Sequence, residues 1–205
     1  MIDINFDKSF KNPVVGIDEV GRGAWVGPVV AGACLLDFSK SLPKNLNDSK
    51  KLSSKSRFGI YEMLKDTAHF GIGKSSNNEI DHYGIQKATF KAMERAFFEL
   101  RKKIGKGKIS TLLIDGNQRP CFKETFDVDI KLIIKGDSLS PSISAASILA
   151  KCTRDFLMIE MDKLYSGYGF NTNMGYGTDY HKKKLILLGP TQQHRMTFAP
   201  MKYMK

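Results

Sequence analysis

The sequence predicts an α/β domain in which a mixed β-sheet is covered by helices. Short segments rich in β-branched residues come first, and strands then alternate with amphipathic helices, which is the order expected for a sheet with helices on its faces. The chain of 205 residues has the length of one globular domain. It contains no internal repeat and no low-complexity linker, so residues 1–205 are expected to form a single domain.

The first part of the chain is expected to form two strands joined by a glycine-rich turn. Residues 14–17 are rich in β-branched residues and lead into an acidic pair. Glycines at 21, 23 and 27 indicate the turn, and a second strand is expected over residues 29–36. The segment DSKKLS at 48–53 is then expected to be a loop.

The middle of the chain predicts helix, strand and helix. A helix is expected near residues 56–65 and a third strand around 68–73. Apolar or small residues recur every three or four positions from Ile85 to Leu100, which indicates an amphipathic helix of about four turns. The basic segment 101–108, RKKIGKGK, is expected to follow it as a linker.

The last part predicts two short strands and two helices. Strands are expected over residues 111–114 and 130–134. Pro141 suits the first turn of a long helix. Residues 165–180 are rich in Gly, Asn and Tyr and indicate a loop, and a final helix is expected from Asp179 to just before Gly189.

Acidic residues follow three of the expected strands: Asp18 and Glu19, then Asp115, then Asp137. If these strands are neighbours, their carboxylates meet at one edge of the sheet, where α/β proteins bind ligands. Such carboxylates repel one another unless a cation is present, and oxygen ligands favour Mg²⁺ or Mn²⁺ over zinc. Two such ions can activate a water and stabilise the leaving oxygen in phosphodiester hydrolysis. Asp-Gly after a strand is also a common turn, so the spacing alone leaves a metal site and an ordinary turn both open.

The charge of the chain favours a polyanionic partner. Lys and Arg number 32 against 21 for Asp and Glu, a formal net charge of +11. Nucleic acid fits this balance, as does an anionic membrane surface, although clusters such as residues 101–108 are also typical of solvated helix faces.

The cellular setting follows from the cysteines and from the apolar segments. Cys34, Cys121 and Cys152 are an odd, widely spaced set, which favours a reducing compartment and neither a disulfide framework nor a zinc site. The N-terminus lacks an apolar signal core, and the longest apolar run, residues 26–36, is about half a membrane span. A cytoplasmic monomer with no membrane segment is therefore expected.

Six segments, in this order, resemble the signature segments of the ribonuclease HII family, and together they cover the chain from about residue 14 to 200. The segments are GIDEVGRGAWVGP (16–28), DSKKLS (48–53), LIDGN (113–117), KGDSLSPSISAASILAKCTRD (135–155), GYGT with His181 (175–181), and HR..F (194–198). The resemblance implies a ribonuclease H-like fold, with a five-stranded mixed sheet, flanking helices and a small C-terminal helical extension. This extension, roughly residues 165–205, would contact substrate.

The resemblance also implies a catalytic centre. Asp18, Glu19, Asp115 and Asp137 would be the catalytic, metal-binding carboxylates, with two Mg²⁺ or Mn²⁺ ions bound together with substrate. The implied activity is endonucleolytic hydrolysis of the RNA strand of RNA–DNA hybrids. It includes cleavage 5′ to single ribonucleotides in duplex DNA, which leaves 3′-hydroxyl and 5′-phosphate ends and serves ribonucleotide excision repair. A sliding-clamp partner is left open.

Substrate contacts are implied on both sides of this centre. The Gly21-Arg22-Gly23 backbone would sense the ribose 2′-hydroxyl at an RNA–DNA junction, because glycines permit close backbone approach and this hydroxyl separates RNA from DNA. Tyr176 would pack on the deoxyribose after the junction. The remaining implied contacts, all to phosphates, are Ser49, Lys50, Lys51 and Lys151.

The two late histidines and two departures from the family pattern complete the expectations. His181 and His194 are expected to be structural or phosphate-facing, because metal ions can perform the proton chemistry. Met174 stands where a lysine is common and Gly84 where an asparagine is frequent. Both departures bear on substrate affinity and neither removes one of the four carboxylates.

Two other functions agree with part of the sequence. The sister enzyme ribonuclease HIII usually has Thr at the position of Arg22 and adds an N-terminal substrate-binding domain, for which Asp18 lies too early in this chain. A non-catalytic nucleic-acid-binding module would explain the basic surface. It would not explain four carboxylates beside a phosphate backbone.

Overall fold

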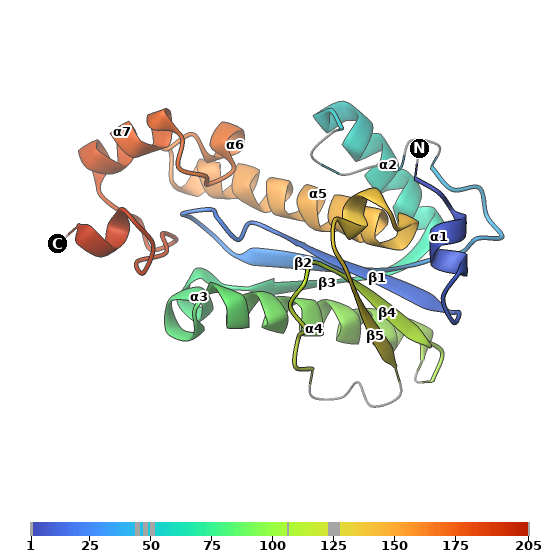
Figure 1. The fold of residues 1–205 in the computed structure, drawn as a ribbon. Helices are drawn as coiled ribbons and strands as arrows, with labels where there is room; N and C mark the ends of the chain where they lie inside the picture. The colour runs from blue at the N-terminus through green and yellow to red at the C-terminus, as the bar shows by residue number, and fades with distance from the viewer. Residues whose placement is uncertain are drawn as a thin grey trace.

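A five-stranded mixed sheet forms the centre of the molecule (Figure 1). The computed structural model describes residues 2–43, 46, 49, 52–105, 107–122 and 128–204. The strand order is β3-β2-β1-β4-β5, with β1–β2 and β2–β3 antiparallel and β1–β4 and β4–β5 parallel, which confirms the expected architecture. The strands are β1 (Val14–Val20), β2 (Val29–Leu36), β3 (Ala68–Ser75), β4 (Thr111–Asp115) and β5 (Asp129–Ile133).

Helices cover both faces of this sheet (Figure 1). The helices α2 (Ser54–Thr67) and α5 (Pro141–Leu164) lie on one face, and α4 (Ile85–Ile104) lies on the other. No helix in the described part of the chain is long and apolar enough to span a bilayer. The shorter elements are α1 (Asn5–Lys8), α3 (Asn77–Tyr83), η1 (Gly136–Ser138), α6 (Phe170–Asn173), α7 (Asp179–Leu188) and η2 (Met201–Tyr203).

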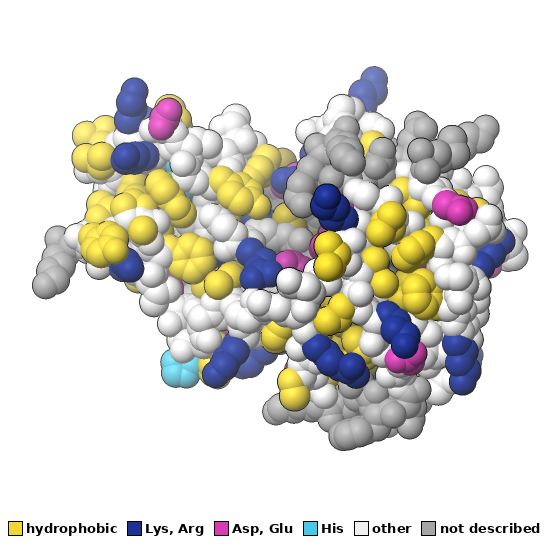
Figure 2. Space-filling view, in the orientation of Figure 1, with side chains coloured by type: hydrophobic (Ala, Val, Ile, Leu, Met, Phe, Trp, Pro, Cys, Tyr) yellow, Lys and Arg dark blue, Asp and Glu magenta, His cyan; other side chains and the backbone are white. Residues whose placement is uncertain are grey.

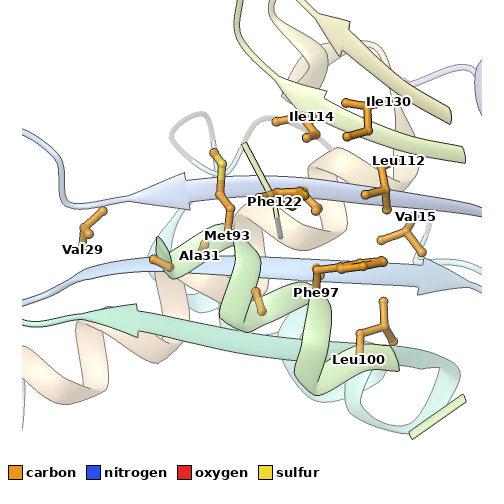
Figure 3. Packing of buried hydrophobic residues seen from close by; sticks show 14 of the residues in the cluster. Val15, Val29, Ala31, Met93, Phe97, Leu100, Leu112, Ile114, Phe122 and Ile130 are labelled. Carbon is orange, nitrogen blue, oxygen red and sulfur yellow. The ribbon is translucent and has the colours of Figure 1, made fainter. Parts of the chain in front are cut away.

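The larger apolar core lies between the sheet and α4 (Figure 3). The predicted stripe of α4 points inward, and its residues Met93, Phe97 and Leu100 pack against Val15 and Leu112 of the sheet. A second cluster fills the space between the sheet, α2 and α5. The site described below therefore stands on strands that are packed on both faces.

Two glycines let α5 approach the sheet closely. A Cβ atom on Gly16 would lie 2.1 Å from the carbonyl carbon of Ser142, and one on Gly32 would lie 2.4 Å from the oxygen of Ala146. The first turn of α5 is also held by Asp7, whose carboxylate accepts a hydrogen bond of 2.9 Å from the amide of Ser142, a favourable place for a negative charge. The N-terminal half of α5 is thereby fixed directly over β1 and β2.

Three boundaries differ from the sequence-based expectation. The first strand does not end before the acidic pair: Asp18 pairs with Gly32 and Glu19 with Ala31, so both belong to β1. The helix α4 continues to Ile104 and includes Arg101, Lys102 and Lys103, which were expected in a linker; cations are favourable in the last turn of a helix. The expected loop 165–180 contains the short helix α6.

Candidate active site

Neighbouring strands bring the predicted carboxylates to one end of the sheet. Ile17 of β1 lies beside Ile114 of the parallel strand β4, so Asp18 and Asp115 follow on adjacent strands. Asp115 Oδ1 accepts a hydrogen bond of 2.7 Å from the amide of Gly136. This bond holds the turn that carries the buried Asp137 against the end of β4.

Asp18 has the most unfavourable environment for a negative charge. Its side chain is buried, and this burial, followed by the charges of Glu19 and Asp115, raises the pKa of Asp18 well above its usual range. Hydrogen bonds from Ser147 and from the amide of Glu19 oppose that rise only in part. A divalent cation would relieve the repulsion between these carboxylates.

The donor set suits a hard cation that keeps part of its hydration shell. Within the described residues, no group of three or more His, Cys, Asp or Glu side chains is arranged to enclose a metal ion. Mg²⁺ is commonly bound by one or two carboxylates together with waters and substrate phosphates. The converging carboxylates therefore fit an open site that substrate completes.

A cavity of about 240 Å³ lies beside these carboxylates. Glu19, Arg22 and Asp115 line it together with Gln86 and Thr89 of α4. Arg22 contacts Glu19 Oε1 at 3.3 Å and Gln86 Oε1 at 2.8 Å, whereas Gln86 Nε2 and Thr89 Oγ1 are buried without a hydrogen-bond partner among the described residues. The sequence analysis did not predict a role for Gln86 or Thr89. The one signal in the sequence was the polar Thr89 within the apolar stripe of this helix.

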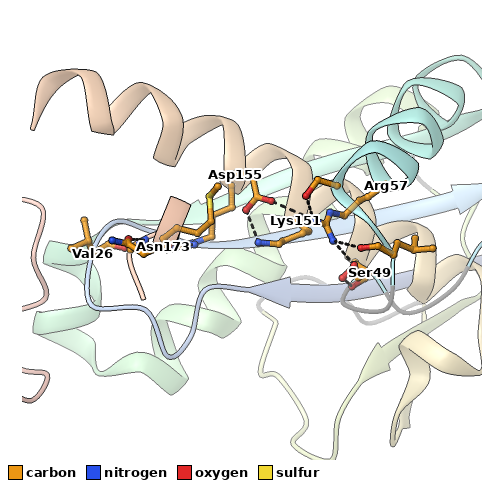
Figure 4. Close-up of polar contacts among 12 residues, drawn as sticks. Val26, Ser49, Arg57, Lys151, Asp155 and Asn173 are labelled. Carbon is orange, nitrogen blue, oxygen red and sulfur yellow. Dashed lines mark hydrogen bonds and ion pairs between the residues drawn. The ribbon is translucent and has the colours of Figure 1, made fainter. Parts of the chain in front are cut away.

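Lys151 belongs to a polar network on α5 (Figure 4). Its ammonium lies 2.6 Å from Asp155 Oδ1, and Asp155 Oδ2 lies 3.9 Å from a guanidinium nitrogen of Arg57. Arg57 in turn donates to the carbonyl oxygen of Ser49. Lys151 and Asp155 thus form an i,i+4 ion pair on α5, and Arg57 of α2 joins it.

Ser49 is linked to the buried carboxylate through α5. Its hydroxyl lies 2.9 Å from the hydroxyl of Ser147, which also hydrogen-bonds Asp18. Because Ser147 donates its proton to the carboxylate, Ser49 is the donor to Ser147. Ser49 is itself buried, and its hydroxyl is engaged by Ser147. Lys50 and Lys51 lie outside the described residues.

The glycine motif lies in the loop between β1 and β2. Gly21 has a φ of 91°, which favours glycine, and a Cβ on Gly23 would meet no atom within 4 Å. The open side of Gly23 agrees with close approach of a ligand. Tyr176 is half-buried, and its ring centroid lies 5.4 Å from the guanidinium carbon of Arg154. Met174, the residue at the position of the common lysine, packs against an apolar cluster.

The two histidines are structural, as expected. His181 and His194 are buried, and their Nε2 atoms lie 3.2 Å apart. Burial lowers the pKa of His181 and, together with the charge of His181, lowers that of His194 to about 4. Both rings are therefore neutral near pH 7, and they lie among aromatic side chains.

Figure 2 shows acidic side chains at the centre of one face of the molecule, with Lys and Arg side chains around them. The carboxylates, which could bind a cation, thus lie within a basic surface of the kind that attracts a phosphate backbone.

Comparison with known proteins identifies the family. The sequence model of ribonuclease HII matches residues 15–201. Ribonuclease HII of Caulobacter vibrioides is 47% identical over 93% of this chain and 86% of its own length. Among solved structures, the fold is similar to ribonuclease HII in a complex with PCNA from Archaeoglobus fulgidus (TM-score 0.73, 22% identity, 90% of this chain and 94% of that one). It is equally similar to Bst-RNase HIII in complex with Mn²⁺ (TM-score 0.73, 19% identity), a match that covers 92% of this chain and 68% of that one. The family match and the close relative together show that this chain belongs to the ribonuclease HII family and is a ribonuclease H, an endonuclease that acts on the RNA of RNA–DNA hybrids.

Proposed function

We propose that the protein cleaves on the 5′ side of ribonucleotides, including a single ribonucleotide within duplex DNA, and leaves 3′-hydroxyl and 5′-phosphate ends. The observation that carries this proposal is the buried Asp18, whose pKa is raised by its burial and by the charges of Glu19 and Asp115, in a protein with a net charge of +11. Carboxylates held in mutual repulsion are ready to bind cations, and the basic surface binds the duplex.

Asp18, Glu19, Asp115 and Asp137 would hold Mg²⁺ or Mn²⁺, with two ions bound when substrate is present. Such ions activate a water for attack on the phosphate and stabilise the leaving oxygen. The protein contributes the placement of these carboxylates: hydrogen bonds from Ser147 and from the amide of Gly136 orient Asp18 and Asp115. The Mn²⁺ in the solved ribonuclease HIII complex supports a divalent ion in this fold.

Flanking residues would bind and orient the substrate. The exposed Gly23, with open space where a Cβ would stand, allows the loop backbone to contact the 2′-hydroxyl of the ribonucleotide, and Tyr176 packs on the next deoxyribose. Lys151, held by Asp155 at 2.6 Å, would contact the scissile phosphate.

The surroundings of the site suggest further roles. The helix α7 carries Lys182, Lys183 and Lys184, and we assign residues 165–205 to a substrate-contacting extension. The free thiols of Cys34, Cys121 and Cys152 agree with action in a reducing cytoplasm. The PCNA complex of the archaeal relative makes a sliding clamp a candidate partner, and the protein itself is proposed to be a monomer.

The test is cleavage of a labelled DNA duplex that contains one ribonucleotide, in Mg²⁺ or in Mn²⁺, beside an all-DNA duplex and an RNA–DNA hybrid. We expect one cut, 5′ to the ribonucleotide, with a 3′-hydroxyl end and no cut in the all-DNA duplex. Asp18→Asn should lower the rate at least about 100-fold, the upper range for loss of a group that merely supports a metal ligand, and should leave duplex binding intact. Cleavage of the hybrid alone would refute the single-ribonucleotide activity.

A further inference from the structure

Two arginines are buried completely beneath the loop that carries the glycine motif. Arg154 of α5 and Arg195, which follows α7, are both 0% exposed. Neither forms an ion pair with a carboxylate in the described part of the chain, and the hydrogen bonds of both guanidinium groups go to main-chain carbonyl oxygens. A buried charge without a counterion is costly. The presence of arginine at both positions therefore indicates that the planar guanidinium, with its several hydrogen-bond donors, is needed there.

Arg195 joins the two ends of the loop between β1 and β2. Its Nη1 donates to the carbonyl oxygen of Arg22 at 2.8 Å, while Nε and Nη2 both donate to that of Gly27, at 3.0 and 2.9 Å. The amide of Arg195 also donates to the oxygen of Trp25 at 2.8 Å. One side chain thus determines the shape of the loop on which the glycine motif lies.

Arg154 joins this loop to the segment that carries Tyr176. Its Nε donates to the oxygen of Pro28 and its Nη2 to that of Val26, both at 3.1 Å, and its Nη1 donates to the oxygen of Met174 at 2.8 Å. A Cβ on Gly21 would lie 2.2 Å from Arg154 Nε. The guanidinium therefore lies directly under the first glycine of the motif and 5.4 Å from the ring of Tyr176.

Contacts around Trp25 hold the same two segments together. The amide of Trp25 donates to the oxygen of Gly175 at 2.8 Å, and a Cβ on Gly177 would lie 2.1 Å from the indole. The oxygen of Tyr176 accepts from His181 Nδ1 at 2.9 Å. The proton position on His181 follows from its contact with His194. The amide of Thr191 donates to His194 Nδ1, so His194 carries its proton on Nε2 and donates it to His181 Nε2. His181 therefore carries its own proton on Nδ1.

We propose that Arg154 and Arg195 are positioning residues that fix the distance between the Gly21-Arg22-Gly23 backbone and Tyr176, and thereby set the selectivity for a single ribonucleotide. This inference rests on the proposed function of these two segments in reading adjacent ribo- and deoxyribonucleotides. Reading two neighbouring sugars requires two contacts at a fixed spacing, which a planar fork with several donors maintains and a flexible ammonium does not. Because neither guanidinium forms a direct ion pair with a described carboxylate, both also add to the field that attracts the phosphate backbone.

The test compares Arg154→Lys and Arg195→Lys with the wild type on two substrates, a duplex with one ribonucleotide and a uniform RNA–DNA hybrid. We expect kcat/KM on the single ribonucleotide to fall at least about tenfold more than on the hybrid, since a displacement of 1 Å in a positioned group can cost about 100-fold. A role in folding alone would lower the melting temperature or reduce both activities equally. Arg95→Lys is the matched control, because Arg95 binds Glu79 and the oxygen of Lys74 away from this loop.

A wedge variant keeps the proposal testable if the lysine variants do not fold. Gly177 is exposed, so Gly177→Ala should fold while its methyl group pushes the indole of Trp25 away from the Tyr176 segment. Trp25 is the sole tryptophan, so its fluorescence reports this displacement without reference to activity. We expect a changed emission spectrum together with the same loss of selectivity.

The outcomes separate this proposal from the proposed function. If the wild type does not cut at a single ribonucleotide, the proposed function fails. If the wild type cuts there, and folded variants keep the ratio of the two activities while the Trp25 spectrum changes, the spacing does not set selectivity and the positioning role is overturned.

Discussion

Replacing His194 by asparagine is expected to remove a defined part of the protein's sensitivity to acid. In the native state its pKa is lowered from 6.5 to about 4 by burial and by the charge of His181. Between these two values the unfolded chain binds a proton that the native protein excludes, so the free energy of unfolding falls as the pH decreases from about 6.5 towards 4. One pH unit of this difference corresponds to about 1.4 kcal/mol, so the contribution that is lost amounts to about 3 kcal/mol.

The assay is urea unfolding of the wild type and of His194→Asn at a series of pH values from 7 to 4, followed by circular dichroism. At pH 7 the variant should be the less stable protein, because Thr191 and His181 lose their partner. The difference in the free energy of unfolding between the two proteins should shrink by about 3 kcal/mol by pH 4. The wild type loses stability as the pH falls because its unfolded state binds a proton at His194, whereas asparagine does not titrate. His82→Asn is the control, since His82 is exposed, and its difference from the wild type should not vary in this way. A deficit of His194→Asn that stays constant from pH 7 to 4 would refute the reasoning.

Three further predictions concern the site and its support. Ser147→Ala should lower kcat by about 10- to 100-fold, because Ser147 orients Asp18 and such supporting bonds have effects of this size. It should also lower the free energy of unfolding by about 1–3 kcal/mol, because the buried Ser49 loses its acceptor; steady-state kinetics and urea unfolding measure the two effects. Tyr176→Ala should reduce the preference for a junction over a uniform hybrid, measured as the ratio of kcat/KM on the two substrates, and an unchanged ratio would contradict the assigned stacking. Gly32→Ala should destabilise the fold by about 3 kcal/mol, because the added methyl group would meet the oxygen of Ala146 at 2.4 Å, and thermal unfolding measures this change.

Local patterns predicted the regular elements well. The apolar run over residues 29–36 has turn residues on both sides, and it matches β2 in full. The stripe of α4 was equally clear, because its spacing follows from helix geometry alone. The short helix α3 was missed, although Ser76 and Glu79 form a capping box at its start, a local signal that was there to be used.

Features that depend on distant partners were harder to predict. The extension of β1 through Asp18 comes from pairing with Gly32, which a scan of one segment does not reveal. Arg195 was seen only as part of a motif, because arginine is normally exposed and its partner Arg22 lies 173 residues away. The carboxylates were found because strand ends of one sheet meet at a common edge, a rule that needs only the order of the elements.

The contact of α5 with Gly32 has a consequence for how this enzyme tolerates change. Gly32 pairs with Asp18 across the β1–β2 ladder, and it lies under Ala146, the neighbour of Ser147. A methyl group at this position would act as a spacer that lifts the helix, and Ser147 and Lys151 would rise with it, away from the carboxylate. The position of Ser147 relative to Asp18 thus depends on the absence of a side chain at Gly32, so random mutagenesis should find Gly32 intolerant even of alanine, although it contributes no functional group.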